Sequence, residues 1–496
     1  MHILWSALAL SATALAQVTG SRPIKFNSKG NPILSDGSWY SADPAPLVVN
    51  NTLYILTGRD SAAPDENNFI MKQWGMFVSS TPNPAGSEWM LYPKVAEPHE
   101  VFAWAAPGTS YAAQVVQGRD GRFYLYAPVT QANSKNEDPF AIGVAVSDSP
   151  TGPYVDAHPS GPIISQSVPP PGNAIQNIDP TVLVDDNGKV YIYFGTFGAL
   201  RAYELDADMV TVRSPVTQVN GLTGFFEAPW LMKRKGVYYL LFAANNAGPD
   251  SPCTPTSYHA CIAYATASSP LGPWKFRDVI LPIVSSTTSH PGAIERNGEW
   301  FLVYHTADAK GGGHFRRSIA LDKLNWDDNQ SPPAIRKVVK TIGSKPPAPP
   351  TYNVAPNAAV NDGIVRANPL PPDYWSSYEA EKSRETSVLT YVWKEPVELN
   401  GTSMVFFADQ DAGANVGVAP PKRWFVEYLD QSSNWMPVVN TTPYPLEVTD
   451  TPKVVKFQTI RTTSIRATLI ASGSGGQFAG VGVKEWEALT TELQKT

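Results

Sequence analysis

Residues 179–195 have the sequence DPTVLVDDNGKVYIYFG, and the fold assignment starts from this stretch. A short apolar run follows Asp179, the dipeptide Asn187-Gly188 comes next, and an aromatic run then begins at Tyr191. Asn-Gly supplies the positive φ angles that a tight hairpin requires, so the stretch predicts two antiparallel strands joined by a short turn.

The same pattern occurs in four other places along the chain. These segments begin at Asp43, Ala112, Glu227 and His290, with turns at Asn50-Asn51, Asp120-Gly121, Lys235-Gly236 and Asn297-Gly298. In every copy, an aromatic residue of the second strand lies 11 or 12 positions after the first residue. Further strands are expected between the hairpins, in residues 75–89, 143–154 and 262–274. Repeats spaced by 48 to 69 residues have room for four short strands each, so five of them predict a five-bladed β-propeller.

The propeller is expected to span residues 21–343, with closing strands in residues 318–328 and 334–341. A proline-rich linker follows over residues 344–374. The last segment, residues 375–496, alternates apolar and polar residues in the manner of a β-sandwich. Its expected strands are residues 423–429, 453–460, 464–471 and 480–489. The sequence therefore predicts an all-β protein in which a five-bladed β-propeller is followed by a β-sandwich domain.

Composition excludes some classes of partner. The 496 residues include 38 Lys and Arg against 44 Asp and Glu, for a net charge of −6, and no run of basic residues is longer than three. A nucleic-acid-binding surface needs clustered positive charge, so we expect no nucleic-acid partner. A hydrophobic content of 43% excludes disorder, and the length exceeds what one core normally fills, which predicts two domains.

The N-terminus carries the one long apolar run of the sequence, Ile3 to Leu15, which ends in Ala14-Leu15-Ala16. This run is typical of a secretory signal peptide over residues 1–16, and it is too short for a membrane anchor. We therefore expect a secreted, extracellular protein that does not associate with a membrane.

Export affects how the two cysteines are interpreted. Cys253 and Cys261 have no other cysteine to pair with, so a disulfide is expected in an oxidising compartment. Closing so short a loop is worth about 2.5 kcal/mol, which stiffens one surface loop. The sequence also contains N-x-Ser/Thr glycosylation triplets at Asn50, Asn329, Asn400 and Asn440, of which the second is weakened by Pro332.

Three of the five repeats begin with an acidic residue: Asp43, Asp179 and Glu227. Taken alone, each is most simply a residue of a turn or of a strand start. Because the first residues of the inner strands surround the propeller axis, the three carboxylates are expected to converge in one pocket. Glycoside hydrolysis needs one carboxylic acid to protonate the leaving oxygen and one carboxylate on the opposite face. A third carboxylate would raise the pKa of the acid.

Flat aromatic side chains are the usual partners of sugar rings. Trp39, Trp74 and Trp104 are candidates for such contacts, and each is at least as well explained as a packing residue.

The sequence resembles glycoside hydrolase family 43 in three blocks: ADPAPLVVNNTLYILTG around Asp43, IDPT around Asp179 and FEAPW around Glu227. The resemblance covers roughly residues 28–341. It implies a five-bladed propeller and inverting hydrolysis, with Asp43 as the general base, Glu227 as the general acid and Asp179 as the residue that orients the acid and tunes its pKa. The base and acid carboxylates of an inverting enzyme lie roughly 6.5 to 9.5 Å apart.

The resemblance also suggests roles for residues of the last repeat. His290 matches a channel histidine that often lies near a bound calcium ion or water. Arg317 matches an arginine that often contacts substrate, and the adjacent Arg316 is the alternative for this role. A lone histidine is equally well explained as a buried, hydrogen-bonded residue, so no cofactor is expected to be required and a structural calcium stays an open possibility.

Two segments are similar to family members that remove β-D-xylosyl or α-L-arabinofuranosyl units. These are NPILSDGSWYSADPAP (residues 31–46) and FIMKQWGMFVSS (residues 69–80). The expected substrate is a plant cell-wall polysaccharide or oligosaccharide, attacked from its end. The alternatives are an endo-arabinanase, an exo-galactanase and a non-catalytic sugar-binding propeller. The second repeat departs from the family pattern at Ala112-Ala113-Gln114, which affects the wall of the site. The C-terminal module loosely resembles discoidin-like sandwiches, which either bind carbohydrate or brace the propeller.

Overall fold

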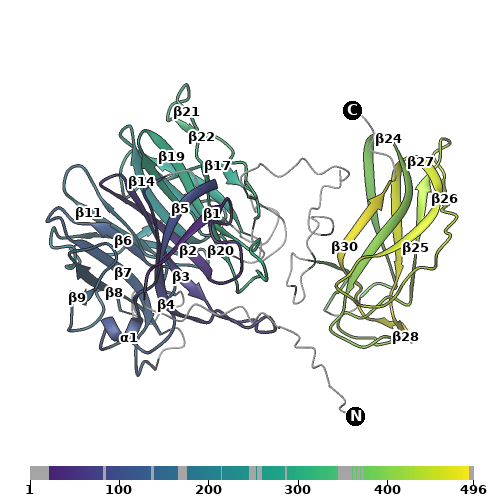
Figure 1. Cartoon of the computed structure of the whole chain (residues 1–496), viewed down its shortest axis with the longest axis horizontal. Coiled ribbons are helices and arrows are strands. Elements are labelled where there is room, and N and C mark those ends of the chain that lie inside the picture. The colour runs from purple at the N-terminus through teal and green to yellow at the C-terminus, as the bar shows by residue number, and fades with distance from the viewer. Residues whose placement is uncertain are drawn as a thin grey trace, which may run out of the picture.

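The computed structural model describes two β units (Figure 1). It covers residues 22–81, 85–135, 139–165, 176–213, 215–244, 253, 260–284, 288–343, 360, 365, 369, 374–380 and 383–490. The expected signal peptide, residues 1–16, lies outside the described residues, as does most of the expected linker.

The first unit is a five-bladed β-propeller, as the repeats predict. Blade one contains β1 (Ile24–Lys29), β2 (Tyr40–Val49), β3 (Thr52–Asp60), β4 (Met71–Ser79) and β5 (Ala85–Ala96); blade two contains β6 (Gln114–Gln117), β7 (Phe123–Thr130), β8 (Phe140–Ser147) and β9 (Val155–Asp156). Blade three contains β10 (Thr181–Val184), β11 (Val190–Phe194), β12 (Leu200–Leu205) and β13 (Thr217–Val219); blade four contains β14 (Phe225–Arg234), β15 (Val237–Ala244), β16 (Cys261–Ala267) and β17 (Lys275–Leu281). Blade five contains β18 (Gly292–Arg296), β19 (Glu299–Thr306) and β20 (Ser318–Lys323).

The innermost strands form a closed ring, because β2, β6, β10, β14 and β18 each contact the next and β18 contacts β2. A short helix, α1 (Pro98–Val101), connects blades one and two, and a small ribbon of β21 (Trp326–Asp327) and β22 (Ala334–Ile335) follows blade five.

The predicted hairpin turns are present with positive φ angles. Asn50 and Asn51 have φ of 46° and 63°, and Asn297 and Gly298 have φ of 52° and 78°. Asparagine and glycine tolerate this left-handed region, so these residues set the register of each hairpin. The first residue of each repeat therefore lies at the opposite end of its inner strand from the turn.

The ring is closed by the N-terminal segment, which corrects one expectation. The predicted closing strand at residues 334–341 is reduced to β22, after which the amide of Val338 donates to Ile280 of blade four. The outer edge of β20 is instead covered by residues near Asn31, since the amide of Ile33 donates to the carbonyl of Ile319. Blade five is thus completed by residues from both ends of the propeller sequence.

Aromatic side chains fill the space between the blades. Trp74, Tyr126, Tyr193, Tyr239 and Tyr304 are fully buried in the clusters that separate neighbouring sheets. These flat, large side chains bury much apolar surface between twisted sheets, which accounts for the aromatic-rich composition.

The second unit is a β-sandwich built from one six-stranded sheet, with the strand order β23-β30-β24-β27-β25-β26. Its strands are β23 (Trp375–Ser376), β24 (Thr386–Phe407), β25 (Arg423–Leu429), β26 (Trp435–Pro437), β27 (Lys453–Ile470), β28 (Gly473–Ser474), β29 (Gln477–Phe478) and β30 (Gly482–Leu489).

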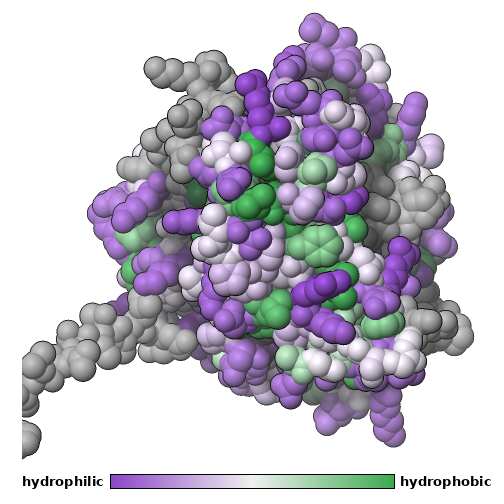
Figure 2. All heavy atoms as spheres, turned by 90° about the vertical axis from the view of Figure 1, so that its right-hand side faces the viewer, coloured by the Kyte–Doolittle hydropathy of each residue, from purple (hydrophilic) through white to green (hydrophobic). Residues whose placement is uncertain are grey.

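The two strands expected at residues 453–460 and 464–471 are one long strand, β27. β27 pairs with β24 on both sides of a register shift between Val392 and Val397, so the long strands pass from one layer of the sandwich to the other. Trp424 and Trp486 occupy the core between the layers. Seen from the side of this unit, the surface is mostly hydrophilic with scattered apolar residues (Figure 2). Single exposed apolar residues are ordinary on soluble domains.

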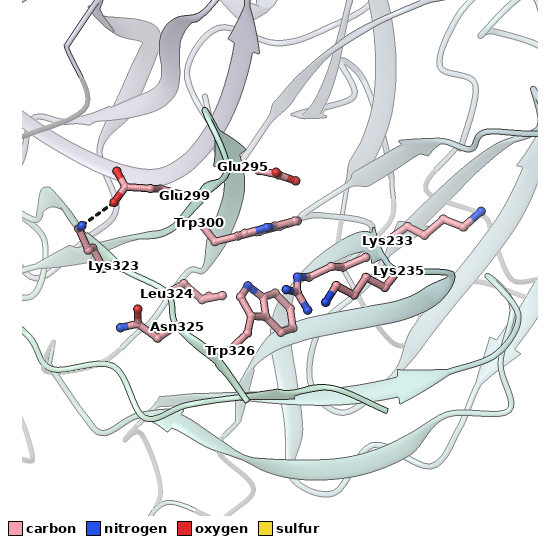
Figure 3. A pocket seen from close by; sticks show the side chains of 11 residues that line it. Lys233, Lys235, Glu295, Glu299, Trp300, Lys323, Leu324, Asn325 and Trp326 are labelled. Atoms are coloured by element: carbon pink, nitrogen blue, oxygen red, sulfur yellow. Dashed lines mark hydrogen bonds and ion pairs between the residues drawn. The ribbon is translucent and has the colours of Figure 1, made fainter. Parts of the chain in front are cut away.

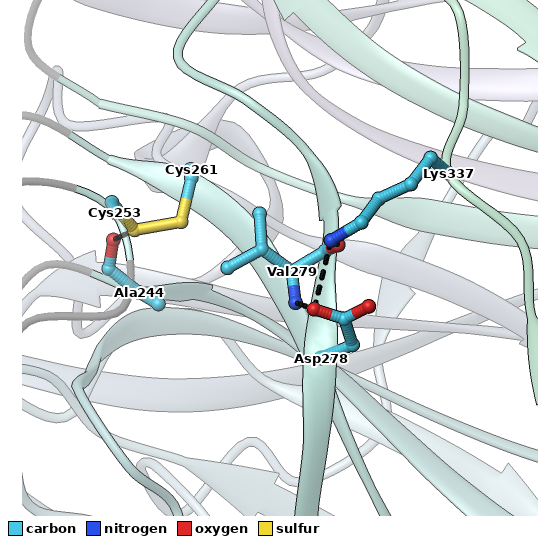
Figure 4. Close-up of a disulfide and its surroundings, with 6 residues drawn as sticks. All are labelled: Ala244, Cys253, Cys261, Asp278, Val279 and Lys337. Carbon is cyan, nitrogen blue, oxygen red and sulfur yellow. Dashed lines mark hydrogen bonds and ion pairs between the residues drawn. A yellow bond between two sulfur atoms is a disulfide. The ribbon is translucent and has the colours of Figure 1, made fainter.

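Cys253 and Cys261 form the expected disulfide, with their Cα atoms 5.7 Å apart (Figure 4). It attaches Cys253 to the start of β16, where Cys261 pairs with Ala244 of β15. In the described part of the chain, no helix has the length and apolar character that crossing a membrane requires. Glycosylation at Asn50, Asn400 and Asn440 stays a prediction.

We predict that Asn31→Ala weakens the propeller at its closure. The Asn31 side chain donates to the carbonyl of Leu321 (3.0 Å) and to Oγ1 of Thr341 (2.7 Å), and it accepts from the amide of Leu321 (2.9 Å). Losing these bonds leaves buried main-chain groups unpaired, at a cost of roughly 2–4 kcal/mol. Calorimetry should show a lower Tm for the propeller transition. Asn329→Ala, at an exposed position, is the control, and equal Tm values for both variants would contradict this account of the closure.

Candidate active site

The three predicted carboxylates lie at the same end of the inner strands. Asp43 is in β2, Asp179 lies two residues before β10, and Glu227 is in β14. The strand pairing of β2 is interrupted between Ala42 and Ala45, and that of β14 between Glu227 and Trp230. Proline follows within two residues of each carboxylate and lacks the N–H that a ladder needs, which explains the interruptions.

The backbone before these prolines is left-handed. Asp43, Asp179 and Ala228 have φ angles of 54°, 56° and 55°, and each is followed by proline. Residues before proline normally adopt extended conformations, so this geometry is strained and requires the surrounding structure to hold it. Strain of this kind is concentrated at functional sites.

Asp43 is held by Arg317, which lies just before β20. Nη1 of Arg317 donates to Oδ1 of Asp43 at 2.9 Å, and the two residues are 8% and 2% exposed. Burial alone would raise the pKa of Asp43, but the Arg317 charge and the neighbouring histidines more than compensate and hold this pKa well below its usual range. Asp43 is therefore a carboxylate at any ordinary pH.

Arg317 is the residue that the resemblance assigns to substrate contact, but all five of its donors are used within the protein. Besides Asp43, Nη1 donates to Thr288, Nε and Nη2 donate to Asp60 at 2.9 and 3.0 Å, and Nη2 also contacts Sδ of Met71. The structure thus makes Arg317 a positioning residue for Asp43 and gives it no free donor for a ligand.

Asp60 and His305 were not identified from the sequence. Asp60, at the end of β3, is buried and forms the paired contact that orients Arg317. His305, near the end of β19, is fully buried and accepts the Asp43 amide on Nδ1 at 3.2 Å. Its Nε2 therefore carries the proton and lies 3.1 Å from the carbonyl of Thr288. The signal that marks both residues is their position at the catalytic end of a second strand.

Glu227 and Asp179 form a second, differently charged group. Asp179 is 6% exposed and accepts the amide of Ala228 at 3.0 Å, while Oγ1 of Thr196 lies 3.4 Å from Oε2 of Glu227. Burial and then the negative charge of Asp43 raise the pKa of Glu227 to about 7. Burial followed by the charges of Glu227 and Asp43 raises the pKa of Asp179 well above its usual range. This pair therefore retains protons near neutral pH, which suits a proton donor.

The residues around His290 do not fit a directly bound calcium ion. Calcium takes six to eight oxygen ligands, whereas His290 presents a nitrogen 3.9 Å from Oδ1 of Asp43, an oxygen already bound to Arg317. Within the described ranges, no group of three or more His, Cys, Asp and Glu side chains is arranged to hold a metal ion. Burial lowers the pKa of His290 to about 4, so its imidazole is neutral beside Asp43.

The tryptophan candidates are packing residues in this structure. Trp74 is 0% exposed and donates to the carbonyl of Tyr111, and Trp39 is equally buried. Trp104 packs on Phe102 and donates to Asp156 in the outermost strand of blade two. Trp39 and Trp74 therefore offer no exposed surface to a ligand, and Trp104 packs against blade two.

Two pairs of phenylalanines lie beside the carboxylates. Phe69 lies under the guanidinium of Arg317 at 4.9 Å, near the base, and packs edge-to-face on Phe315. Phe226 directly precedes Glu227 and packs edge-to-face on Phe197. Phe69, Phe197 and Phe315 were missed because isolated phenylalanines in loops carry no periodic signal, whereas Phe226 lies in β14.

A cavity of about 470 Å³ lies at the other end of the blades (Figure 3). Trp300 and Trp326 line it together with residues of the turns after β14 and β18. Its cations are already paired, for example Lys323 with Glu299 at 2.6 Å. Since the carboxylates lie at the opposite ends of the inner strands, this cavity is separate from the candidate active site.

The arrangement combines an ionised carboxylate with a protonated one in a single buried site. The first accepts a proton from water and the second donates one to a departing oxygen, which is the requirement for displacing a glycosidic bond.

Comparisons with known proteins agree with this chemistry. The family model for glycosyl hydrolases family 43 matches residues 30–332. A xylosidase/arabinosidase of Bacteroides ovatus is 28% identical over 332 residues, which is 58% of this chain and 92% of the relative.

Solved structures show the same fold. The crystal structure of a family 43 β-xylosidase/α-arabinofuranosidase from a compost microbial metagenome, in complex with xylotriose and in a calcium-free form, matches with a TM-score of 0.51 and 26% identity, covering 65% of this chain and 99% of that one. An arabinoxylan arabinofuranohydrolase from Bacillus subtilis, in complex with cellotetraose, matches 93% of this chain and 98% of its own with a TM-score of 0.51 and 19% identity, so its fold corresponds to both β units.

We predict a pH profile in which activity is lost as the pH rises through about 7, because Glu227 then loses the proton that it donates. Asp43 stays ionised far into the acid range, so the base produces no loss of activity between pH 5 and 7. The measurement is kcat/KM against pH on an oligosaccharide with a poor leaving group, with circular dichroism at each pH to confirm folding. An alkaline limb near the ordinary pKa of a glutamic acid would contradict the assignment.

Proposed function

The chain belongs to glycosyl hydrolases family 43, and on that premise we propose that it is an exported, exo-acting glycosidase that inverts configuration. Its proposed substrates are terminal β-D-xylosyl and α-L-arabinofuranosyl residues of xylan or arabinoxylan fragments. The observation that carries the proposal is the contrast between Asp43, whose pKa is lowered beside Arg317, and Glu227, whose pKa is raised to about 7.

The proposed reaction is a single displacement. Asp43 accepts a proton from water, and the water oxygen forms a bond to the anomeric carbon. The bond from that carbon to the glycosidic oxygen breaks, and Glu227 gives its proton to this oxygen. Burial and the negative charge of Asp43 keep the acid protonated before reaction, and Asp179, held by the Ala228 amide, takes the orienting role beside it. Net, water is added and the anomeric configuration is inverted.

Exo action is supported by the depth of the carboxylates. Asp43 is buried, at 8% exposed, beside Arg317 at 2%, whereas Glu227 is only partly buried. The base therefore lies at the closed end of the site, so the sugar between base and acid is a terminal one. The names of the relatives support pentosides as substrates.

Export is supported by the apolar N-terminal run and by the disulfide between Cys253 and Cys261, since disulfides persist in oxidising compartments.

We predict that Glu227→Gln abolishes hydrolysis and spares binding. On xylobiose or an arabinoxylan oligosaccharide, kcat should fall by at least about 100-fold because the leaving oxygen receives no proton. Calorimetric titration with the same sugar should give a Kd close to that of the wild type, and Glu299→Gln, at the other end of the blades, is the matched control. A variant that turns over oligosaccharides at the normal rate would remove Glu227 from the role of acid, and a wild type that binds without hydrolysis would indicate a lectin.

We also predict monosaccharide products. Digests of arabinoxylan, arabinan, galactan and xylobiose, separated by chromatography, should yield free xylose or arabinose, and proton NMR taken at once should show the inverted anomer. Release of oligosaccharides from arabinan would favour endo-arabinanase activity, and release of galactose would favour exo-galactanase activity.

A further inference from the structure

Phe197 is an exposed aromatic residue in a strained position at the catalytic end of blade three. It lies in the loop between β11 and β12, its side chain is 59% exposed, and its φ angle is 52°. A bulky residue in the left-handed region costs free energy, and an exposed ring returns little of it through burial. Folding alone therefore gives no reason for a phenylalanine here.

The loop is fixed to both members of the acid pair. Thr196 contacts the Glu227 carboxylate, and the amide of Gly198 donates to the carbonyl of Phe226 at 3.3 Å. On its other side, the amide of Gly195 donates to the carbonyl of Ile178, next to Asp179. Loop position and acid position are thus set by the same contacts.

The Phe197 ring is supported from one side. Its centroid lies 5.6 Å from that of Phe226 at an interplanar angle of 75°, an edge-to-face contact, and Phe226 is the residue before the acid. This contact fixes the orientation of the ring and leaves much of its surface open to solvent.

We propose that Phe197, braced by Phe226, is the stacking platform for the sugar that leaves, a pyranose unit of a xylan-type chain. This inference rests on the proposed function and extends it to a second sugar position.

The geometry of the displacement gives the reason. Water attacks from the side of Asp43, so the leaving sugar departs on the opposite side, where Glu227 protonates the shared oxygen. A residue attached to the acid and directed to solvent lies on that departing side. The C–H face of a pyranose is apolar and flat, so it packs on an aromatic ring as other apolar surfaces do.

The test compares substrates that share a terminal sugar and differ in the leaving group. For Phe197→Ala, kcat/KM on xylobiose or an arabinosylated xylo-oligosaccharide should fall roughly tenfold, while kcat/KM on the glycosyl fluoride of the same sugar should stay within about twofold. Fluoride is too small to stack, so its departure does not need the platform. Phe197→Tyr keeps the ring and should restore oligosaccharide activity.

The controls separate failure of this inference from failure of the proposed function. Phe197→Ala keeps a Cβ at the strained position and removes an exposed ring, so its Tm should match the wild type. Tyr378→Ala, at an exposed aromatic residue of the sandwich, should change neither substrate. A wild type that hydrolyses neither substrate would reject the proposed function. A wild type active on both, with equal losses or no loss on both in Phe197→Ala, would reject the platform alone.

Discussion

The buried contact of Arg317 with Asp43 and Asp60 is the interaction on which the rest of the structure depends. It places one guanidinium between two carboxylates, with bonds of 2.9 to 3.0 Å. Breaking such a buried set leaves an uncompensated charge, which is far more costly than losing an exposed pair. Arg317 precedes β20 of blade five, and both aspartates belong to blade one, so the contact crosses the seam where the propeller closes. Closure of the fold and the low pKa of Asp43 therefore depend on the same contact.

The three carboxylates differ in protonation because the positive charge of Arg317 lies beside only one of them. Arg317 contacts Asp43 directly, whereas Glu227 and Asp179 have the Thr196 hydroxyl and the Ala228 amide as neighbours. Three carboxylates in one low-dielectric site repel each other, and the cation decides which of them is ionised. Environment in this way gives different roles to groups of similar intrinsic acidity.

Sequence patterns were sufficient for the propeller and the carboxylates because both repeat. Asn-Gly and similar turns fix the hairpins, and acidic residues at repeat starts predict convergence around an axis. Asp60 and His305 were not predicted, since their position at the ends of second strands gains meaning only when blades one and five meet. Trp74 has the chemistry of a sugar platform, and only packing shows that it is buried. The merging of two expected strands into β27 likewise depends on its pairing with β24.

The prolines near the carboxylates connect fold and chemistry at the level of the backbone. A proline interrupts the strand ladder, and the preceding residue takes a left-handed conformation that an ordinary strand would not accommodate. The interrupted ladder leaves the amides of Asp43 and Ala228 without a strand partner. The Asp43 amide donates to Nδ1 of His305, and the Ala228 amide donates to the Asp179 carboxylate. Each of the three carboxylates is thus oriented by a hydrogen bond to another residue of the site. A neighbouring blade supplies the partner each time, so the precision of the site derives from the packing of the ring rather than from any single strand.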